Sequence, residues 1–449
     1  MSLNNEFDLV NYLTVERERG TIIWMFNIGI EKFWNNENFS LKDVKENAIV
    51  NRIEEMNLLL TRKQDILILR NKPDSKYLKD LEDLGFDIPI ILSPQMKDDE
   101  KSIAELVLND TYLLSELKEL SDHNKELYFV PYGVSSLEEE IARRCDLTIV
   151  GATSELNKKI NNKVFSRRIS EALELTTTEG CICNSLEEVE AAYHKLKKKF
   201  DKIIIKQPCG ASGKGLYIVE NDRKFKSTSM ILSRFERINQ ESEWIVEGWY
   251  DKKADINYQI YVSESGEVTT FSVKEQIVDK TIYVGSVMPP RISDDIYNQY
   301  IKYGDIIGKE LYAQGFTGIL GIDSIITSED IVIPIIEINA RFTLSTYVSF
   351  LKNKYPNKKM YSFYERIHLT TDMNYEKFQK ILIDSDIVFD KVNKHGVLCY
   401  VSATLKIDDD NRSGRLFAVV MGDNGKQLEE YKKKIDIILQ NMKSIDGRI

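Results

Sequence analysis

Residues 318–339 restrict the fold of this chain more than any other stretch. The runs GILGIDSII (318–326) and IVIPIIEIN (331–339) are rich in β-branched residues, and the polar run TSED separates them. Two apolar runs joined by a short polar turn predict an antiparallel β-hairpin. With the turn centred near TSED, Asp323 lies across from Glu337 within a residue or two.

Oxygen-bearing side chains gather on one face of this predicted hairpin. Glu337 and Asn339 are two residues apart on a strand and therefore point to the same side, where Asp323 faces them. Two facing carboxylates among apolar residues repel each other and lose hydration unless a cation neutralises them. Ligands that are all oxygen favour Mg2+ or Mn2+. The residues leave one alternative, an ion pair of these acids with Arg341, and the same-face spacing favours the metal.

A second feature is a loop of small residues between two β-rich runs, KIIIK (202–206) and LYIVEN (216–221). The loop includes Gly210, Ala211, Ser212, Gly213, Lys214 and Gly215. Its backbone N–H groups can approach phosphate oxygens closely, because no bulky side chain obstructs them. A P-loop is excluded, since Pro208 and Gly215 stand where that motif needs Gly and Ser or Thr. A plain hairpin tip is the alternative.

The first 150 residues alternate short apolar runs with charged helical stretches. The apolar runs are 65–70, 88–92, 126–133 and 146–152. This alternation predicts a partly parallel sheet with helices on its faces. Serine caps followed three residues later by glutamate predict helix starts at SSLEEE (135–140) and at Ser185.

The rest of the chain is predicted in three stretches. Residues 155–201 are expected to be mainly helical, and strands follow at 244–250, 256–262 and 268–273. The tail from about residue 395 has its own β runs and a helix from 427 to about 442. We therefore expect an α/β and α+β protein with domains at 1–150, 151–390 and 391–449.

Four elements in order resemble the ATP-grasp superfamily over roughly residues 155–350. They are Lys206 on a strand, the glycine-rich hairpin after it, the strand end VEGWY (246–250) and the D…E-I-N-A-R pattern. The resemblance implies ATP held between two α+β subdomains in residues 151–390. It also implies a pre-ATP-grasp α/β domain in residues 1–150 and a small C-terminal α/β unit, β-rich and helical, in residues 391–449.

The resemblance implies a role for individual residues. Lys206 would contact the α-phosphate of the nucleotide, and Lys163 would be the earlier lysine of the same pocket, with Lys158 and Lys159 as competitors for Lys163. The hinge strand Glu247, Gly248, Trp249 and Tyr250 would read adenine, with Glu243 as an alternative register, and Asp255 would serve the ribose. Asp323, Glu337 and Asn339 match the metal ligands, and Arg341 matches the basic residue over the transferred phosphoryl group. Arg291, which follows MPP (288–290), is predicted separately as a clamp for a substrate carboxylate, with a surface salt bridge as an equal alternative.

The implied activity is that of an ATP-dependent, Mg2+-requiring ligase that joins a carboxylate to an amine through an acyl phosphate. The whole chain resembles natural-product ligases of the pheganomycin peptide-ligase type, which favours an amino acid or short peptide as substrate. A ligase of the butirosin type, which loads an amino acid such as glutamate onto an acyl carrier protein, is the nearest rival. A small-molecule kinase and a nucleotide-binding regulator without turnover are further alternatives.

The composition and the apolar patterning limit the classes of partner that the protein is expected to bind. With 71 acidic and 61 basic residues, the net charge of −10 disfavours binding of nucleic acid. The N-terminus lacks a signal-peptide pattern, and no run approaches the ~18 apolar residues of a membrane span. We expect a cytoplasmic protein with no membrane contact and with free thiols at its five scattered cysteines. The sequence leaves the oligomeric state open.

Overall fold

The computed structural model describes residues 10, 13, 20–34, 49–208, 215–238, 243–279, 281–368, 373–405 and 413–444. Within these ranges the strands form three sheets of five, four and eight strands. Gly210, Ala211, Ser212, Gly213 and Lys214 lie outside the described residues, so their predicted contact with phosphates stays a prediction.

The five-stranded sheet is parallel throughout, as the alternation in the first 150 residues predicts. Its strand order is β3-β2-β1-β4-β5. The strands are β1 (Thr21–Met25), β2 (Ile66–Ile68), β3 (Ile90–Leu92), β4 (Leu127–Pro131) and β5 (Thr148–Ile149). The elements between them are α2 (Glu31–Trp34), the 3-10 helix η1 (Ile53–Leu59), α4 (Ser75–Asp83), α5 (Ile103–Leu108), α6 (Thr111–His123) and α7 (Ser136–Cys145).

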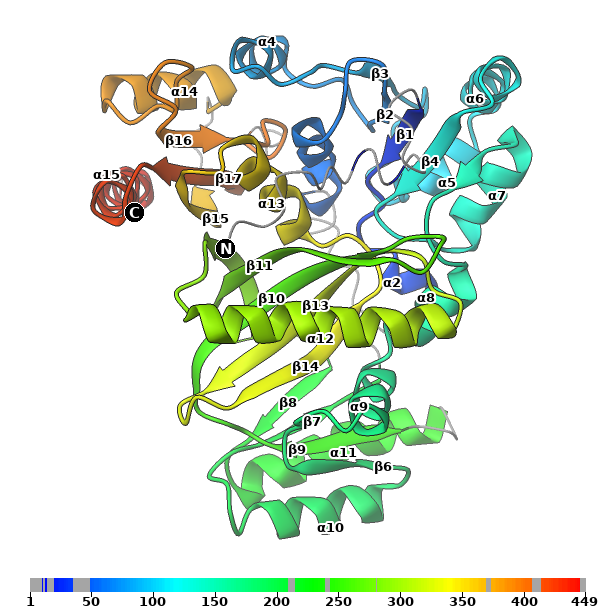
Figure 1. Cartoon of the computed structure of the whole chain (residues 1–449), viewed down its shortest axis with the longest axis vertical. Helices are drawn as coiled ribbons and strands as arrows, with labels where there is room; N and C mark the ends of the chain where they lie inside the picture. Colours follow the sequence, from blue (N-terminus) through cyan, green and yellow to red (C-terminus); the bar gives the residue numbers. More distant parts are fainter. Residues whose placement is uncertain are drawn as a thin grey trace.

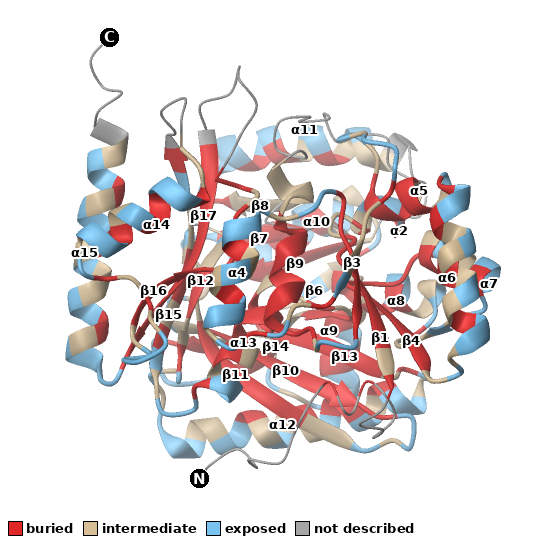
Figure 2. Cartoon of the chain, turned by 90° about the horizontal axis from the view of Figure 1, so that it is seen from above, coloured by how far each residue is buried: buried red, intermediate tan, exposed pale blue. Residues whose placement is uncertain are grey.

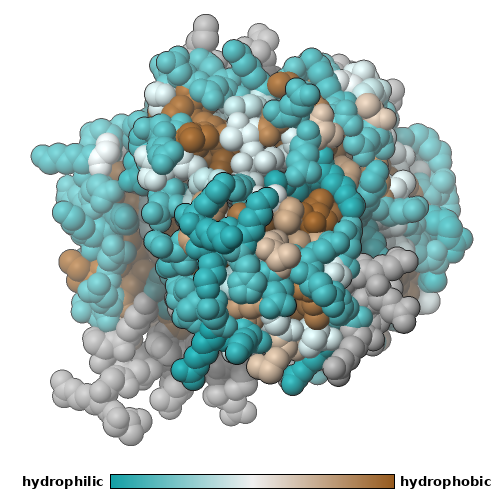
Figure 3. Space-filling model, turned by 90° about the horizontal axis from the view of Figure 1, so that it is seen from below, coloured by the Kyte–Doolittle hydropathy of each residue, from teal (hydrophilic) through white to brown (hydrophobic). Residues whose placement is uncertain are grey.

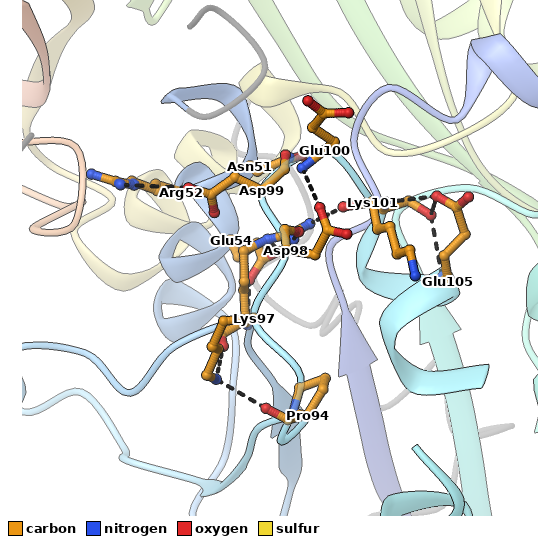
Figure 4. A network of polar contacts seen from close by, with 12 residues as sticks. Asn51, Arg52, Glu54, Pro94, Lys97, Asp98, Asp99, Glu100, Lys101 and Glu105 are labelled. Atoms are coloured by element: carbon orange, nitrogen blue, oxygen red, sulfur yellow. Dashed lines mark hydrogen bonds and ion pairs between the residues drawn. The ribbon is translucent and has the colours of Figure 1, made fainter. Parts of the chain in front are cut away.

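A buried ion pair anchors the segment that follows β3, and Figure 4 shows Glu54 next to Lys97 and Asp98 of that segment. Glu54 in η1 accepts the backbone N–H of Arg70 at 2.7 Å, and its carboxylate lies 3.5 Å from Arg70 Nε. The Arg70 guanidinium donates to the carbonyl oxygens of Asp98 and Lys101, each at 2.8 Å. Burial raises the pKa of Glu54 to about 7, although Arg70 acts to lower it. The carboxyl edge of β2 is thereby fixed by polar contacts.

The four-stranded sheet forms a separate layer at the bottom of Figure 1, covered by two helices. Its order is β6-β9-β7-β8, and all its pairs are antiparallel. The predicted hairpin of 202–221 is confirmed as β7 and β8. Ser185 caps its helix by accepting the Glu188 N–H at 3.2 Å. The elements are α8 (Ser154–Ile160), α9 (Lys163–Ala172), β6 (Gly180–Cys183), α10 (Leu186–Leu196), β7 (Ile203–Lys206), β8 (Leu216–Val219), α11 (Asp222–Ile238) and β9 (Trp244–Gly248).

The eight-stranded sheet runs in the order β14-β13-β10-β11-β12-β15-β17-β16. Its strands are β10 (Lys252–Val262), β11 (Val268–Asp279), β12 (Ile282–Met288), β13 (Gly318–Thr327), β14 (Val332–Asn339), β15 (Lys359–His368), β16 (Gly396–Cys399) and β17 (Ser413–Gly422). The helices are α12 (Asp294–Ala313), α13 (Leu344–Lys354), α14 (Tyr375–Asp384) and α15 (Gly425–Ser444). Strands from the predicted C-terminal unit thus pair, through β15, with the sheet that carries the hairpin. The domain boundaries at 150 and 390 stay predictions.

One hydrophobic cluster joins the parallel sheet to the eight-stranded sheet. Trp24 of β1 packs edge-on against Phe342, with ring centres 6.3 Å apart, and Phe26 lies 5.2 Å from Tyr347 of α13. Figure 2 shows the buried strands enclosed by helices whose outer faces are exposed. This packing holds the ends of β1 and β4 next to the end of β14, where Arg341 follows.

The face of the molecule shown in Figure 3 is mainly hydrophilic. Seen from below in Figure 3, apolar side chains form separate spots among hydrophilic ones. Across the described ranges, no helix is long and apolar enough to cross a membrane.

Candidate active site

The strands β13 and β14 pair with Asp323 directly opposite Glu337, as predicted, and with Gly321 opposite Asn339. Asn339 Nδ2 donates to Asp323 Oδ2 at 3.1 Å, so the three predicted ligands lie together. Burial raises the pKa of Asp323 to about 6, and the charge of Glu337 adds to this rise. The two carboxylates therefore face each other in a site where full ionisation needs a cation.

Lys163, rather than Arg341, supplies the cation nearest to Glu337 in this structure. Lys163 Nζ lies 2.8 Å from Glu337 Oε1, whereas Arg341 Nη2 lies 2.8 Å from Glu31 Oε1. The alternative of a direct ion pair between Arg341 and the hairpin acids is therefore not what the structure shows.

The hairpin acids suit a hard cation by their chemistry. Two carboxylates and the amide oxygen of Asn339 are the ligands that Mg2+ prefers, and Mg2+ commonly keeps waters or substrate phosphates in its shell. Within the described part of the chain, no group of three or more His, Cys, Asp or Glu side chains is placed to hold a metal. A metal at Asp323 and Glu337 would therefore share its shell with Asn339 and with oxygens of a bound molecule.

A cleft between α9, β7, β9 and β14 brings together three residues predicted to bind the nucleotide. Lys163, Lys206 and Glu247 all line it. Lys206 Nζ lies 2.6 Å from Glu247 Oε2. The remaining lining residues are Arg167, Ser170, Thr177, Thr178, Ile245, Ile335 and Ile336. Because Lys163 also contacts Glu337, the cleft lies next to the acid pair on the hairpin.

Glu247 lies at the centre of a buried charge cluster. Burial acts to raise its pKa, but the charges of Lys206 and then Arg167 outweigh burial and lower it. Arg167 Nη1 lies 3.3 Å from Glu247 Oε1 and also donates to the Thr178 carbonyl at 2.6 Å. Sequence reasoning missed Arg167, although its position four residues after Lys163 on one helix face was a usable signal.

Lys159 and Lys163, which competed for the same predicted role, lie on different helices. Lys159 belongs to α8, where its Nζ donates to Gln314 Oε1 at 3.1 Å. Lys163 begins α9 and is buried in the cleft, and its backbone N–H donates to the Pro208 carbonyl at 2.8 Å. This contact ties the start of α9 to the end of β7.

The hinge residues follow Glu247 at the end of β9. The backbone N–H groups of Gly248 and Trp249 donate to the carbonyls of Glu179 and Lys202, each at 2.9 Å. Tyr250 accepts the Glu179 N–H at its hydroxyl, at 3.1 Å. These contacts fix the hinge next to the cleft, and the reading of adenine by this backbone stays a prediction.

Glu243, the alternative register for the hinge, pairs with Arg168 rather than with Lys206. Asp255 lies on β10, where its Oδ1 is 2.7 Å from Lys252 Nζ. Gly215 has a φ of 75° and accepts the Gln207 N–H at 2.8 Å. A positive φ suits glycine, and here it closes the β7–β8 hairpin.

Arg291 is occupied by a neighbouring acid in this structure. Its Nε donates to Glu275 Oε2 at 2.9 Å, a second contact joins Nη2 to Oε1, and its side chain is 72% exposed. The structure therefore does not bring Arg291 to the hairpin acids, and its role as a clamp for a carboxylate stays a prediction.

The sheet face that carries the acids continues across two further strands. Pairing aligns Glu337, Asp323, Asn257 and Lys274 in one row across β14, β13, β10 and β11. Asn257 Nδ2 and Gln276 Nε2 each donate to Asp323 Oδ1 at 2.8 Å. Sequence reasoning missed these amides, and the polar residues alternating along NYQ (257–259) and SVKEQ (272–276) were the only signal.

This row connects Asp323 to α13. Ser345 Oγ donates to Asn257 Oδ1 at 3.2 Å, and Lys274 Nζ donates to Ser349 Oγ at 2.7 Å. Burial lowers the pKa of Lys274 to about 7, although Asp323 acts to raise it. The helix that follows Arg341 is thereby fixed against the strands that hold the acids.

Comparison with known proteins agrees with this geometry. Residues 205–339 match the family described as "L-aspartate--L-methionine ligase, ATP grasp", and residues 53–147 match the pre-ATP-grasp domain. The chain is an ATP-grasp ligase with a pre-ATP-grasp domain. Enzymes of this class use ATP with Mg2+.

Individual relatives cover almost the whole chain. It is 28% identical over 432 residues to the "[Butirosin acyl-carrier protein]--L-glutamate ligase" of Niallia circulans, covering 92% of this chain and 94% of that protein. The N5-carboxyaminoimidazole ribonucleotide synthetase purK, in its ADP complex, is similar with a TM-score of 0.56 at 15% identity, over 94% of this chain and 98% of that one. Biotin carboxylase from Campylobacter jejuni gives 0.55 at 15% identity, over 93% and 91%. The two structures support the fold alone.

Proposed function

We propose that this protein joins the carboxylate of one amino acid or short peptide to the amine of a second. The observation that supports the proposal is the contact of Lys163 with Glu337, because Lys163 also lines the cleft that contains Lys206 and Glu247. ATP would lie in the cleft with its terminal phosphate directed toward Asp323, Glu337 and Asn339.

In this proposal the protein acts mainly by positioning and by offsetting charge. Lys206 and Lys163 bind the phosphates in place of their present partners Glu247 and Glu337. Asp323, Glu337 and Asn339 would hold Mg2+, which supplies charge neutralisation for phosphoryl transfer. The acid's carboxylate attacks the γ-phosphate, ADP leaves, and Arg341 stabilises the negative charge on the acyl phosphate. The amine then displaces phosphate to give an amide.

The comparisons support amino-acid substrates. The matched family is described as a ligase of L-aspartate and L-methionine, and the similar Niallia protein is described as a glutamate ligase. We therefore propose L-aspartate and L-glutamate as acids to test first, with L-methionine as the first amine.

A second candidate is transfer to the thiol of an acyl carrier protein. It is favoured by similarity to the Niallia circulans ligase along more than nine-tenths of both chains. The chemistry up to the acyl phosphate is the same in both candidates, so only the acceptor differs.

One assay tests both candidates. The purified protein, ATP and Mg2+ are incubated with amino acids singly, in pairs and with carrier proteins, and ADP and products are measured by mass spectrometry. An amide formed together with ADP and phosphate supports the first candidate. An aminoacylated carrier supports the second, and ADP release with a phosphorylated product in place of a ligated one would contradict both.

A further inference from the structure

Two residues of the pre-ATP-grasp domain lie against Arg341. Arg341 Nη2 is 2.8 Å from Glu31 Oε1, and its Nη1 donates to the Tyr132 hydroxyl at 3.1 Å. The guanidinium carbon lies 5.4 Å from the centre of the Tyr132 ring. Glu31 follows β1 and Tyr132 follows β4, so both lie at the carboxyl edge of the parallel sheet. Ligands of open α/β sheets bind at that edge.

Backbone contacts hold these residues in place. Tyr132 N–H donates to the Met25 carbonyl, and Phe342 N–H donates to the Tyr132 carbonyl, each at 2.9 Å. A Cβ atom at Gly133 would lie 3.3 Å from Arg341 Cβ, so glycine allows the close approach of the two segments. These contacts hold Tyr132 and Arg341 side by side.

Glu31 is the more accessible partner of its ion pair with Arg341. Burial acts to lower the pKa of Arg341, but Tyr132, Glu31 and the hairpin acids raise it above its ordinary value. Arg341 Nε is buried and makes no hydrogen bond to the described residues. The Glu31 side chain is 21% exposed and that of Arg341 11%, so the carboxylate is the more accessible partner. An approaching ammonium group would therefore meet the Glu31 carboxylate first.

We propose that Glu31 binds the ammonium group of the acceptor and accepts a proton from it. The proposal rests on the function proposed above, in which Arg341 stabilises the acyl phosphate. It assigns the acceptor a chemical class, a protonated primary amine such as the α-amine of an amino acid. Neither Glu31 nor Tyr132 was identified from the sequence.

The step balances in atoms and charge. One proton of the ammonium passes to the Glu31 carboxylate, and the neutral amine attacks the acyl carbon. The new C–N bond forms as the C–O bond to phosphate breaks, and phosphate leaves with the electron pair of that bond. The second proton of the attacking nitrogen leaves with the phosphate, so the products are an amide, hydrogen phosphate and protonated Glu31.

A simpler reading is that Glu31 only neutralises Arg341. The two roles of Glu31 predict different results with an acceptor that needs no carboxylate to remove its proton. Hydroxylamine is largely uncharged at neutral pH and attacks acyl phosphates without a base. It therefore reports formation of the acyl phosphate independently of Glu31.

The test compares Glu31→Gln with wild type, using L-aspartate or L-glutamate as acid and either L-methionine or hydroxylamine as acceptor. We expect the variant to lose amide formation by about 100-fold or more, while its hydroxamate formation stays close to wild type. Glu31→Asp, which keeps the carboxylate, should restore part of the amide formation. Glu140→Gln, at an exposed ion pair on α7, is the matched control and should change neither reaction.

Three outcomes would overturn the proposal. Equal loss of amide and hydroxamate would mean that Glu31 acts only through Arg341. Unchanged amide formation would mean that Glu31 does not contact the acceptor. If the wild-type protein forms neither product with any acid, the proposed function itself fails. This outcome is distinguishable from the first two because it is seen without any substitution. If Glu31→Gln does not fold, the same contrast between the acceptors is read from Glu31→Ala.

Discussion

At the scale of residues, the proposed role of the hairpin acids Asp323 and Glu337 can be tested directly by substitution. Replacing Glu337 by Gln removes one of the two facing charges and the partner of Lys163 while keeping the side-chain shape. We expect ATP turnover to fall by about 100-fold or more, as for loss of a group that stabilises charge in the transition state. Turnover is measured by ADP release. Glu329→Gln, in the exposed turn between β13 and β14, is the control.

Retained turnover in Glu337→Gln would contradict the assignment of this residue to the metal. The same measurement over a range of Mg2+ concentrations adds a second readout. Loss of a ligand should raise the Mg2+ concentration needed for half-maximal rate, whereas a variant that merely unfolds would lose activity at every concentration.

Lys206 is tested through nucleotide binding. A charge-assisted hydrogen bond contributes about 1.5–3 kcal/mol, so Lys206→Ala should weaken binding of ATP by about 10- to 100-fold. It should also lower stability, because Glu247 then keeps only Arg167 as a cationic partner in the cleft among the residues described. Titration calorimetry measures the affinity.

Lys202→Ala is the control for Lys206, since Lys202 forms an exposed ion pair with Glu220 on the same hairpin. An unchanged dissociation constant for ATP in Lys206→Ala would exclude the proposed contact with the phosphates.

The sequence predicted residues that a strand or hairpin brings together. Asp323 and Glu337 face each other because local pairing alone determines their distance. The ion pairs of Lys163 with Glu337 and of Arg341 with Glu31 were not predictable in this way. Each joins segments more than 170 residues apart, and their meeting depends on how separate sheets pack.

At the scale of elements, most strands with strong apolar patterning were predicted, but the buried strand β1, with the sequence TIIWM, was not. The runs that became β2, β3, β4, β9, β10, β13 and β14 were all identified, and the caps at Ser135 and Ser185 marked helix starts. The short strand β6 was missed inside a region predicted to be mainly helical. Its sequence GCIC shows no clear alternation of apolar and polar residues. Pairing with β9, which the sequence does not reveal, makes it a strand.

The row of amides across β10 and β11 predicts a positioning effect. Asn257→Leu keeps the volume but removes the hydrogen bond to Asp323 and the acceptor for Ser345. Loss of such outer partners typically costs about 10- to 100-fold in metal affinity or activity. We expect a higher Mg2+ requirement with an unchanged KM for ATP, measured by steady-state kinetics. A rise in both constants alike would indicate a general structural defect instead.

At the scale of the whole molecule, a buried carboxylate joins the first domain to the C-terminal strands. Glu55 of η1 accepts the backbone N–H groups of Ser402 at 2.5 Å and Ala403 at 3.0 Å. Burial raises its pKa from 4.5 to about 7, and these hydrogen bonds only partly oppose the rise. The folded protein therefore binds a proton at Glu55 more tightly than the unfolded chain does.

Proton binding at Glu55 therefore makes the free energy of unfolding depend on pH, with a definite sign. Between about pH 4.5 and about pH 7 the folded state holds the proton that the unfolded state has released, so stability contributed by Glu55 falls as pH rises. Glu55→Gln should lack this dependence. The difference in unfolding free energy between wild type and variant should shift by up to about 3 kcal/mol across this window, measured by urea unfolding at several pH values. A constant difference would show that Glu55 titrates normally.

The fold class followed from the sequence because both the parallel α/β region and the hairpins have strong local patterns. The junction between them did not, and it is where Arg341 meets Glu31. The packing of the two sheets therefore brings Glu31 into the proposed reaction centre. Because this contact depends on packing, sequence motifs could not predict the residues proposed to bind the acceptor.

The central claim is that the acid is activated as an acyl phosphate, and isotope transfer tests it most directly. The acid is labelled with 18O in its carboxylate and incubated with the protein, ATP, Mg2+ and an amine, and the phosphate released is analysed by mass spectrometry. We predict that each phosphate carries one 18O atom from the acid. Unlabelled phosphate, or release of AMP and pyrophosphate in place of ADP, would contradict the account.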